Sequence, residues 1–146
     1  MLTPSKKIHY AIEAVLYIAY NAKAAPVSGT EVSAAQNLPT RYLEPMMQKL
    51  VRAGILRGVR GPTGGYLLGR ERRNITLADI CNTVGGAMTL PATATTLGEK
   101  VLRPVAEELM RRWQEELASV SIATLCDRAG GLKIAHTAAT PTDFTI

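Results

Sequence analysis

The sequence is poor in the residues on which metal sites and disulfide frameworks depend. It has only two cysteines in 146 residues, Cys81 and Cys126, with no CxxC pair and no histidine at ligand spacing from either. Zinc sites and disulfide frameworks need several such residues at characteristic spacings. We therefore expect no metal and no cofactor in this chain, and the scarcity of cysteine fits a reducing cytoplasm.

The motifs of common enzymes are also missing. The sequence has no nucleophile elbow, and "GPTGG" at 61–65 is too short and wrongly placed for a phosphate-binding loop. An apolar stretch follows Lys6 and Lys7 as in a signal peptide, but His9 and Glu13 interrupt it and its apolar residues recur with helical period. We expect neither an enzyme nor a membrane protein.

What the sequence does have is an uneven distribution of charge. The net charge is +5, but residues 1–75 carry eleven Lys and Arg against four Asp and Glu, whereas residues 76–146 carry six against eight. A chain of this length, 47% of it hydrophobic, has the size of one domain with a core of its own. The presence of only one Phe and one Trp indicates a core of helices packed through aliphatic side chains. The basic N-terminal half indicates either a solvated face or a nucleic-acid footprint.

The N-terminal half also has the pattern of a helix-turn-helix. Apolar residues at spacings of three and four predict an amphipathic helix capped by Ser5 or Thr3. A capping box of Ser28 and Glu31 predicts a short helix over 29–36. After "NLP", a third helix begins near residue 40 and ends at Gly54. The apolar face of this third helix consists of Leu43, Met46, Met47 and Leu50.

Two strand-like runs follow the third helix. "ILRGV" and "YLLGR" flank "RGPTGG", which predicts a β-hairpin with a six-residue, glycine-rich tip. A helix-turn-helix followed by a hairpin is the order of a winged helix. The predicted fold class is therefore mainly α with a small β-hairpin, and the hairpin should project on the same side as the third helix.

The C-terminal half predicts two more helices. Thr76 and Asp79 form a capping box for a helix over about 77–84, and Thr96 and Glu99 form another that opens a long helix, which Pro104 should kink or delay. The apolar stripe of the long helix consists of Leu97, Val101, Leu102, Val105, Leu109, Trp113, Leu117 and Val120. The small winged helix cannot cover this stripe, so we expect a homodimer formed through Leu102, Val105, Leu109, Trp113 and Leu117.

These elements give a provisional division of the chain. Residues 1–85 form a winged helix-turn-helix DNA-binding domain, 86–95 a loop, 96–130 a dimerisation helix region and 131–146 a tail.

The segments "YLEPMMQKLVRAGILRGVRGPTGGYLLGR" and "ITLADI" resemble the Rrf-two family of bacterial winged-helix regulators, which includes IscR, NsrR and CymR. The resemblance spans about residues 1–125. It implies a homodimeric, sequence-specific transcription regulator, more often a repressor, that binds a partly palindromic operator in double-stranded DNA. The third helix of each subunit would enter the major groove and the wing the adjacent minor groove.

The resemblance also implies which residues face DNA. Arg60 matches the arginine that enters the minor groove, Pro62 stiffens the wing tip and Gly61 permits close approach. In the third helix, the residues that match or neighbour the DNA-facing positions of the family are Thr40, Arg41, Tyr42, Glu44 and Gln48. For Tyr42, packing in the core is an equal alternative to DNA contact. Lys6 and Lys7 suit phosphate contacts. Pro39 and Pro45 depart from the family pattern, and Pro45 is expected in the first turn or so of its helix.

The largest departure concerns the sensor. The iron–sulfur members carry three clustered cysteines before the long helix, but the corresponding stretch here, "GGAMTLPATATTLGEK", has none. We therefore expect no cluster. Two other means of sensing stay open. One is thiol oxidation at Cys81 or Cys126, although burial would make either thiol inert, and the other is an effector or partner protein that binds near the loop. A separate alternative for the function is a winged-helix protein-interaction module that does not bind DNA.

Overall fold

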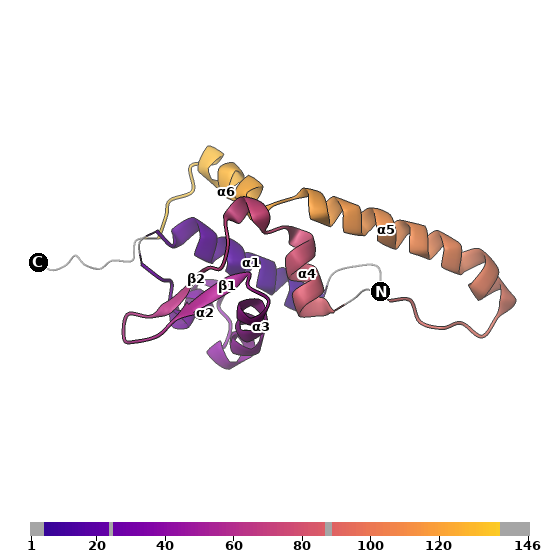
Figure 1. Ribbon diagram of the computed structural model, residues 1–146, viewed down its shortest axis with the longest axis horizontal. Helices are drawn as coiled ribbons and strands as arrows, with labels where there is room; N and C mark the ends of the chain where they lie inside the picture. The colour runs from indigo at the N-terminus through magenta and orange to yellow at the C-terminus, as the bar shows by residue number, and fades with distance from the viewer. Residues whose placement is uncertain (1–4, 24, 87–88, 138–146) are drawn as a thin grey trace, which may run out of the picture.

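The chain folds into a helical body from which one long helix projects as an arm (Figure 1). It is a computed structural model that describes residues 5–23, 25–86 and 89–137. The body contains α1 (Lys6–Asn21), α2 (Gly29–Gln36), α3 (Thr40–Arg52), β1 (Leu56–Val59), β2 (Gly65–Leu68), α4 (Leu77–Gly85) and α6 (Ile122–Gly131), and the arm is α5 (Arg103–Ser119). This mainly helical winged-helix architecture with one hairpin confirms the predicted fold class.

The first two helices have the N-terminal caps expected from the sequence. Ser5 Oγ accepts the Ile8 N–H at 3.4 Å, and Ser28 Oγ accepts the Glu31 N–H at 3.0 Å. The expected capping box at Ser28 is only half formed, because the Glu31 carboxylate accepts the Tyr17 hydroxyl at 3.0 Å. That bond joins the start of α2 to α1.

The third helix ends as predicted and turns the chain into the hairpin. Gly54 adopts a φ of +77°, its N–H donates to Val51 O and the Ile55 N–H donates to Leu50 O, each at 3.0 Å. These two bonds form a Schellman motif, which needs a residue that tolerates the left-handed region at its centre. Figure 1 shows that the hairpin leaves the body beside α2 and α3.

The wing is a two-stranded antiparallel hairpin with a shorter tip than predicted. Val59 pairs with Gly65, so the loop spans the five residues 60–64 rather than six. On its other side β2 pairs with the segment before α2, because the Val27 N–H donates to Tyr66 O at 3.0 Å and the Tyr66 N–H donates to Val27 O at 2.8 Å. The base of the wing is thus hydrogen-bonded on both sides.

The capping box predicted for α4 is complete. Thr76 Oγ1 accepts the Asp79 N–H at 3.1 Å, and the Asp79 carboxylate accepts the Thr76 N–H at 2.9 Å and the Arg70 guanidinium at 3.0 Å. Burial raises the pKa of the Asp79 carboxyl, but the hydrogen bonds from Thr76 and Arg70 outweigh it and hold that pKa below its usual range.

The helical segment that leads into the arm begins at Thr96, one residue earlier than predicted, and has a different cap. Thr95 Oγ1, not Thr96, accepts the Gly98 N–H at 2.9 Å, and the Glu99 carboxylate bonds Thr93 instead of completing a box. A π-helical turn over Gly98–Leu102 precedes α5, and Pro104 lies in the first turn of α5. The regular α-helix is therefore delayed to Arg103, as expected from a proline that lacks an N–H.

The prediction of a single long helix continuing beyond Val120 is wrong. α5 ends at Ser119, Val120 has an extended backbone, and Ser121 Oγ accepts the Thr124 N–H at 3.1 Å to cap a new helix, α6. A β-branched residue followed by a serine cap offers the chain an extended corner at this point. Sequence periodicity did not show this break, because Val120 continues the apolar stripe.

The corner changes two expectations about side chains. Leu117, predicted as a dimer contact, is only 7% exposed in the single chain, because it packs against Ala78 and Cys81 of α4. Cys126, within the 96–130 region predicted to be one dimerisation helix, lies instead in α6 and belongs to the main hydrophobic core. The remaining predicted dimer residues, Leu102, Val105, Leu109 and Trp113, are exposed.

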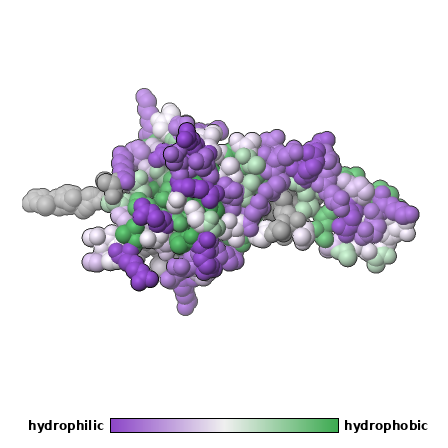
Figure 2. Space-filling model, viewed as in Figure 1, coloured by the Kyte–Doolittle hydropathy of each residue, from purple (hydrophilic) through white to green (hydrophobic). Residues whose placement is uncertain are grey.

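The arm carries much of the exposed hydrophobic surface. Figure 2 shows apolar residues at the free end of the arm, away from the body.

Within the described residues, no helix is both long enough and apolar enough to cross a bilayer.

Candidate nucleic-acid interface

The face of α3 opposite the core presents the side chains predicted to face DNA. Leu43, Met46, Met47 and Leu50 are buried, as predicted, and their burial turns the intervening positions outward. The exposed positions include Thr40, Arg41, Tyr42, Glu44 and Gln48. Amphipathic packing therefore leaves every predicted α3 residue exposed, and Thr40, Glu44 and Gln48, four residues apart, follow one side of the helix.

The start of α3 is held by neighbours instead of by its own cap. Pro39 is the N-cap residue and supplies no side-chain hydrogen bond, but the hydroxyls of Thr40 and Ser33 lie 3.0 Å apart and join α3 to α2. Pro45 lies in the second turn of α3, beyond the first turn expected from the sequence. An interior proline removes one intrahelical bond, and here the affected carbonyl belongs to the exposed Arg41.

Tyr42 combines the two roles that the sequence left open. Its ring meets that of Tyr10 in α1 edge to face, with centroids 6.0 Å apart, yet 43% of the residue is exposed. One edge of the ring therefore stabilises the contact between α1 and α3, and the rest stays available to a ligand.

The tip of the wing is a tight turn that carries Arg60 at its start. The Gly64 N–H donates to Gly61 O at 2.9 Å, with Pro62 at the second position of the turn, where its fixed φ is favoured. Arg60, Gly61 and Pro62 are all exposed. This geometry presents the arginine on a stiff backbone.

The glycines of the wing serve two different purposes. A Cβ on Gly65 would lie 2.3 Å from Val27 O, and one on Gly64 would lie 2.1 Å from Val59 O, so both are needed by the protein's own backbone. Gly61 has a φ of +108° and open space around its Cα. Of the three, only Gly61 fits the expected role of admitting a ligand closely.

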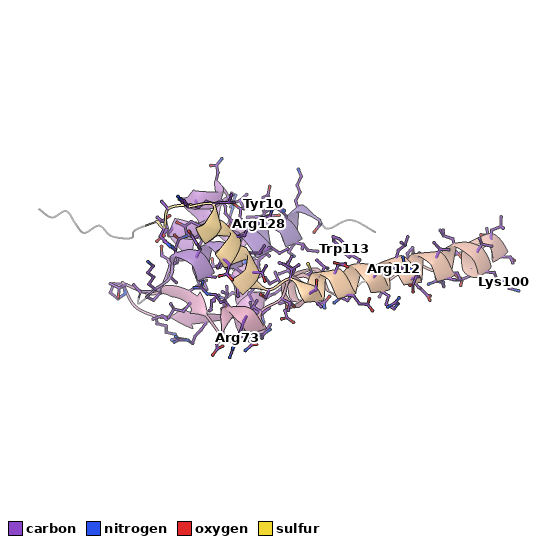
Figure 3. The ribbon with its side chains drawn as sticks, turned by 90° about the horizontal axis from the view of Figure 1, so that it is seen from above. Tyr10, Arg73, Lys100, Arg112, Trp113 and Arg128 are labelled. Carbon is purple, nitrogen blue, oxygen red and sulfur yellow. The ribbon has the colours of Figure 1, made fainter. Side chains whose placement is uncertain are left out.

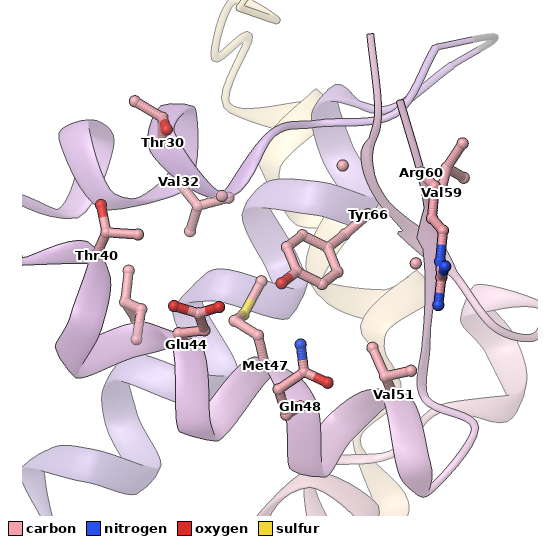
Figure 4. Close-up of a pocket in the computed structure, with 14 residues that line it drawn as sticks. Thr30, Val32, Thr40, Glu44, Met47, Gln48, Val51, Val59, Arg60 and Tyr66 are labelled. Atoms are coloured by element: carbon pink, nitrogen blue, oxygen red, sulfur yellow. The ribbon is translucent and has the colours of Figure 1, made fainter. Parts of the chain in front are cut away.

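A groove of about 550 Å³ separates α3 from the wing (Figure 4). Thr40, Glu44 and Gln48 line it from α3, and Arg60 lines it from the wing. The structure thus brings together four of the predicted residues around one cavity. Lys6 is exposed on the first turn of α1 and is not among the lining residues.

Two polar side chains that line the groove were not singled out from the sequence. Thr30 contributes from α2, and Tyr66 of β2 reaches across the groove. Burial and then the nearby Glu44 carboxylate raise the pKa of the Tyr66 hydroxyl above its usual value, so Tyr66 stays a neutral hydrogen-bond donor at neutral pH. The only sequence indication for Tyr66 was an aromatic residue directly after the wing glycines, because its groove-facing position depends on pairing with Val27.

The basic residues divide into two groups by their ion pairs. On the arm, Arg103, Arg111 and Arg112 all pair with glutamates of the same helix, and hydrogen bonds from Arg111 and Arg112 lower the pKa of Glu108 to about 2. Figure 3 shows Lys100 and Arg112 along this arm. Among the described residues, no carboxylate pairs with the basic side chains of α3 and the hairpin: Arg41, Lys49, Arg52, Arg57 and Arg60.

Unpaired cations are what binding to a polyanion requires. A cation already neutralised by a neighbouring carboxylate gains little from a phosphate, whereas a solvated one can replace a counterion of DNA. The unpaired basic side chains of α3 and the hairpin are therefore available for phosphate contacts.

The two thiols do not fit an iron–sulfur cluster. Cys81 packs beside Leu117, Cys126 lies in the main core, and burial raises the pKa of both thiols. A cluster needs several converging thiolates, and a raised pKa disfavours the thiolate. In 89–95, the described part of the loop, Thr93 instead binds the Glu99 carboxylate and Pro91 O accepts from Arg103 at 2.8 Å. In the described ranges, no three His, Cys, Asp or Glu residues are placed to hold a metal ion.

Known proteins resemble this chain in sequence and in fold. The HTH-type transcriptional regulator IscR of Escherichia coli is 36% identical over 80 residues, which cover 55% of this chain and 49% of that protein. The chain thus spans about half the length of the curated relatives it matches. Among solved structures, T. potens IscR has a TM-score of 0.75 and 30% identity over 92% of this chain and 93% of that one. CymR, the global cysteine regulator of B. subtilis, has a TM-score of 0.72 and 26% identity over 88% and 98%.

The family match extends beyond the winged helix. Residues 4–128 match the Rrf2 family, described as an iron-dependent transcriptional regulator. The named relatives are transcriptional regulators, which agrees with the expectation that the chain is not an enzyme. The match includes the body and the arm, and with the shared fold it establishes that this chain belongs to the Rrf2 family of transcriptional regulators.

Proposed function

We propose that this protein is a cytoplasmic, homodimeric repressor that binds a partly palindromic operator in double-stranded DNA. The observation that carries the proposal is the groove between α3 and the wing, with exposed polar side chains on one wall, Arg60 on the other and unpaired cations around it. A helix of this size fits the major groove, and the wing then reaches the adjacent minor groove.

Each predicted contact has a role that matches its chemistry. Arg60 enters the minor groove, whose narrow stretches concentrate negative potential. Glu44 accepts from a cytosine amino group and Arg41 binds a phosphate or a guanine edge. Thr40, Tyr42, Gln48, Gly61 and Pro62 contact DNA around them, and Lys6 and Lys7 contact phosphates from the start of α1.

The homodimer forms through the exposed stripe of the arm. Leu102, Val105, Leu109 and Trp113 follow one side of the helix at spacings of three and four, and all four are exposed in the single chain. A stripe of this kind on a soluble protein calls for a partner, and a second copy supplies an identical, self-complementary stripe. In this arrangement 1–85 is the DNA-binding domain, 86–95 the loop, 96–130 the dimerisation region and 131–146 the tail.

Regulation does not require an iron–sulfur cluster in this proposal. The alternative of thiol sensing at Cys81 or Cys126 is disfavoured by the burial of both side chains. The alternative of a protein-interaction module differs from this proposal in its salt dependence, since phosphate contacts by the unpaired basic residues beside the groove make DNA affinity fall steeply with salt.

The test is binding of the purified protein to fragments of its source genome, followed by titration of the retained fragments between about 50 and 200 mM salt. A recurrent inverted repeat and a steep loss of affinity with salt are expected. Arg111→Ala is a matched control, because Arg111 is paired on the arm. Arg60→Ala should weaken binding, whereas Arg111→Ala should not. Retained fragments without a common motif, or affinity independent of salt, would contradict the proposal.

A further inference from the structure

Glu44 lines the groove as a carboxylate without a partner among the described residues. Among the described residues it makes no ion pair and accepts no hydrogen bond, although Gln48 lies one turn further along α3. A carboxylate that enters a DNA groove meets the negative potential of the phosphates. It is useful for reading a base only if one of its oxygens is oriented toward that base.

Tyr66 is the neutral donor placed to orient it. Figure 4 shows the ring of Tyr66 crossing the groove from β2, with its hydroxyl directed toward Glu44 and Met47 of α3. Glu44 and Tyr66 line the same groove, and the Glu44 carboxylate adds to the effect of burial in raising the pKa of the Tyr66 hydroxyl. In contrast to the hydroxyls of Tyr17 and Tyr20, which bond Glu31 and Ile134, that of Tyr66 has no hydrogen-bond partner among the described residues.

The backbone under Tyr66 is fixed. It pairs with Gly58 in β1 and exchanges two hydrogen bonds with Val27, and its ring approaches Gly29 so closely that a Cβ there would lie 3.5 Å from Cε2. The position of the hydroxyl therefore follows from the base of the wing and not from the exposed tip. A rigid support of this kind is what a precise hydrogen bond requires.

We propose that Tyr66 is a positioning residue for Glu44. When the operator binds, the Tyr66 hydroxyl donates a hydrogen bond to one oxygen of the Glu44 carboxylate, so that the other oxygen faces a base. A neutral hydroxyl suits this role better than a cation, because it orients the carboxylate without neutralising it. The wing then contributes to sequence reading in the major groove as well as to contact with the minor groove. The inference rests on the proposed operator binding.

The experiment measures the affinity of the full chain for an operator and for each single base substitution in one half-site. The variants are Glu44→Gln, Tyr66→Phe, the double variant, and Tyr20→Phe as a control that removes a tyrosine hydroxyl outside the groove. Because preference is a ratio of affinities, a change in the folded fraction of a variant cancels.

Glu44→Gln should abolish the preference at one base pair, and Tyr66→Phe should reduce the preference at that same base pair by about threefold to tenfold, the value of one hydrogen bond. The double variant should lose no more than Glu44→Gln alone, because the two residues act as a unit. Tyr20→Phe should change no preference.

The proposal fails if Tyr66→Phe leaves the preference intact, or if it weakens every operator equally, which would identify a phosphate contact. It also fails if Glu44→Gln changes no preference. These outcomes differ from failure of the proposed function, in which the wild-type protein itself shows no preference for any operator.

Discussion

Removing one leucine from the arm tests the homodimer most directly. Leu109 is 47% exposed in the single chain and lies in the middle of the stripe. Full burial of a leucine contributes about 1.5–3 kcal/mol, so covering its exposed half contributes about 1 kcal/mol per subunit. A symmetric dimer contains the residue twice, and Leu109→Ala should therefore weaken association by about 2 kcal/mol, or about 30-fold in the dissociation constant.

Sedimentation of the purified protein over a range of concentrations measures this change. Leu132→Ala is the matched control, because Leu132 is also an exposed leucine but follows α6, away from the stripe. We expect the control to associate like the wild type. At concentrations where the protein is monomeric, both variants should have the same melting temperature as the wild type. The reasoning would be refuted by equal dimer constants for Leu109→Ala and the wild type, or by a wild-type protein that stays monomeric.

Three further substitutions test the wing and the body. Arg60→Ala should weaken operator binding by about 1–3 kcal/mol with the dimer intact, measured by anisotropy and sedimentation; loss of the dimer would mean that the wing is misplaced. Gly65→Ala should lower the free energy of unfolding by about 2 kcal/mol or more, and by more than Gly61→Ala, because only at Gly65 does the new Cβ meet backbone atoms. Asp79→Ala should cost about 1 kcal/mol at pH 7. The pKa of Asp79 is lower in the folded protein than in the unfolded chain, so its carboxylate stabilises the fold above the ordinary carboxyl pKa. This stabilisation is lost as the pH falls through the pKa of the folded protein. The melting temperatures of Asp79→Ala and the wild type should therefore converge in acid.

The elements that sequence predicted well are those specified by neighbouring residues. The box of Thr76 and Asp79, the cap at Ser28 and the turn at Gly54 each depend on side chains within a few positions. The burial of one α3 face also follows from local periodicity, whereas Glu44 and Gln48 were identified from the resemblance to the Rrf2 family.

The features that sequence did not predict depend on contacts between distant segments. Ser121 caps α6 and also pairs with Thr76, 45 positions away, and this bridge favours the corner that ends α5. Tyr66 faces the groove because β2 pairs with Val27, which lies almost 40 positions earlier. Leu117 continues the apolar stripe in sequence, yet it is covered by α4. Periodicity identifies an apolar face but does not show which residues of that face pack within the chain and which await a partner.

The joint between arm and body leads to a prediction about operator spacing. At the corner, the Leu77 N–H donates to Val120 O at 2.9 Å and the Ile122 N–H donates to Ile75 O at 2.8 Å, so the residues that start α4 and α6 are held together by backbone bonds. Leu117 adds hydrophobic contact with α4. We expect a joint with these bonds to let each α3 move little relative to its own arm. In the proposed homodimer, pairing of the two arms would then fix the distance between the two α3 helices.

Insertion of about five base pairs between the half-sites turns one of them to the opposite face of the duplex, since B-DNA repeats every 10–10.5 base pairs. We expect affinity for this operator to fall to that of a single half-site. Insertion of a full helical turn should not restore it, because the distance between the half-sites then exceeds the fixed distance between the two α3 helices. Binding measured by anisotropy on a series of spacers gives the answer. Equal affinity across the series would mean that the body swivels on the arm, in spite of the bonds between Val120 and Leu77.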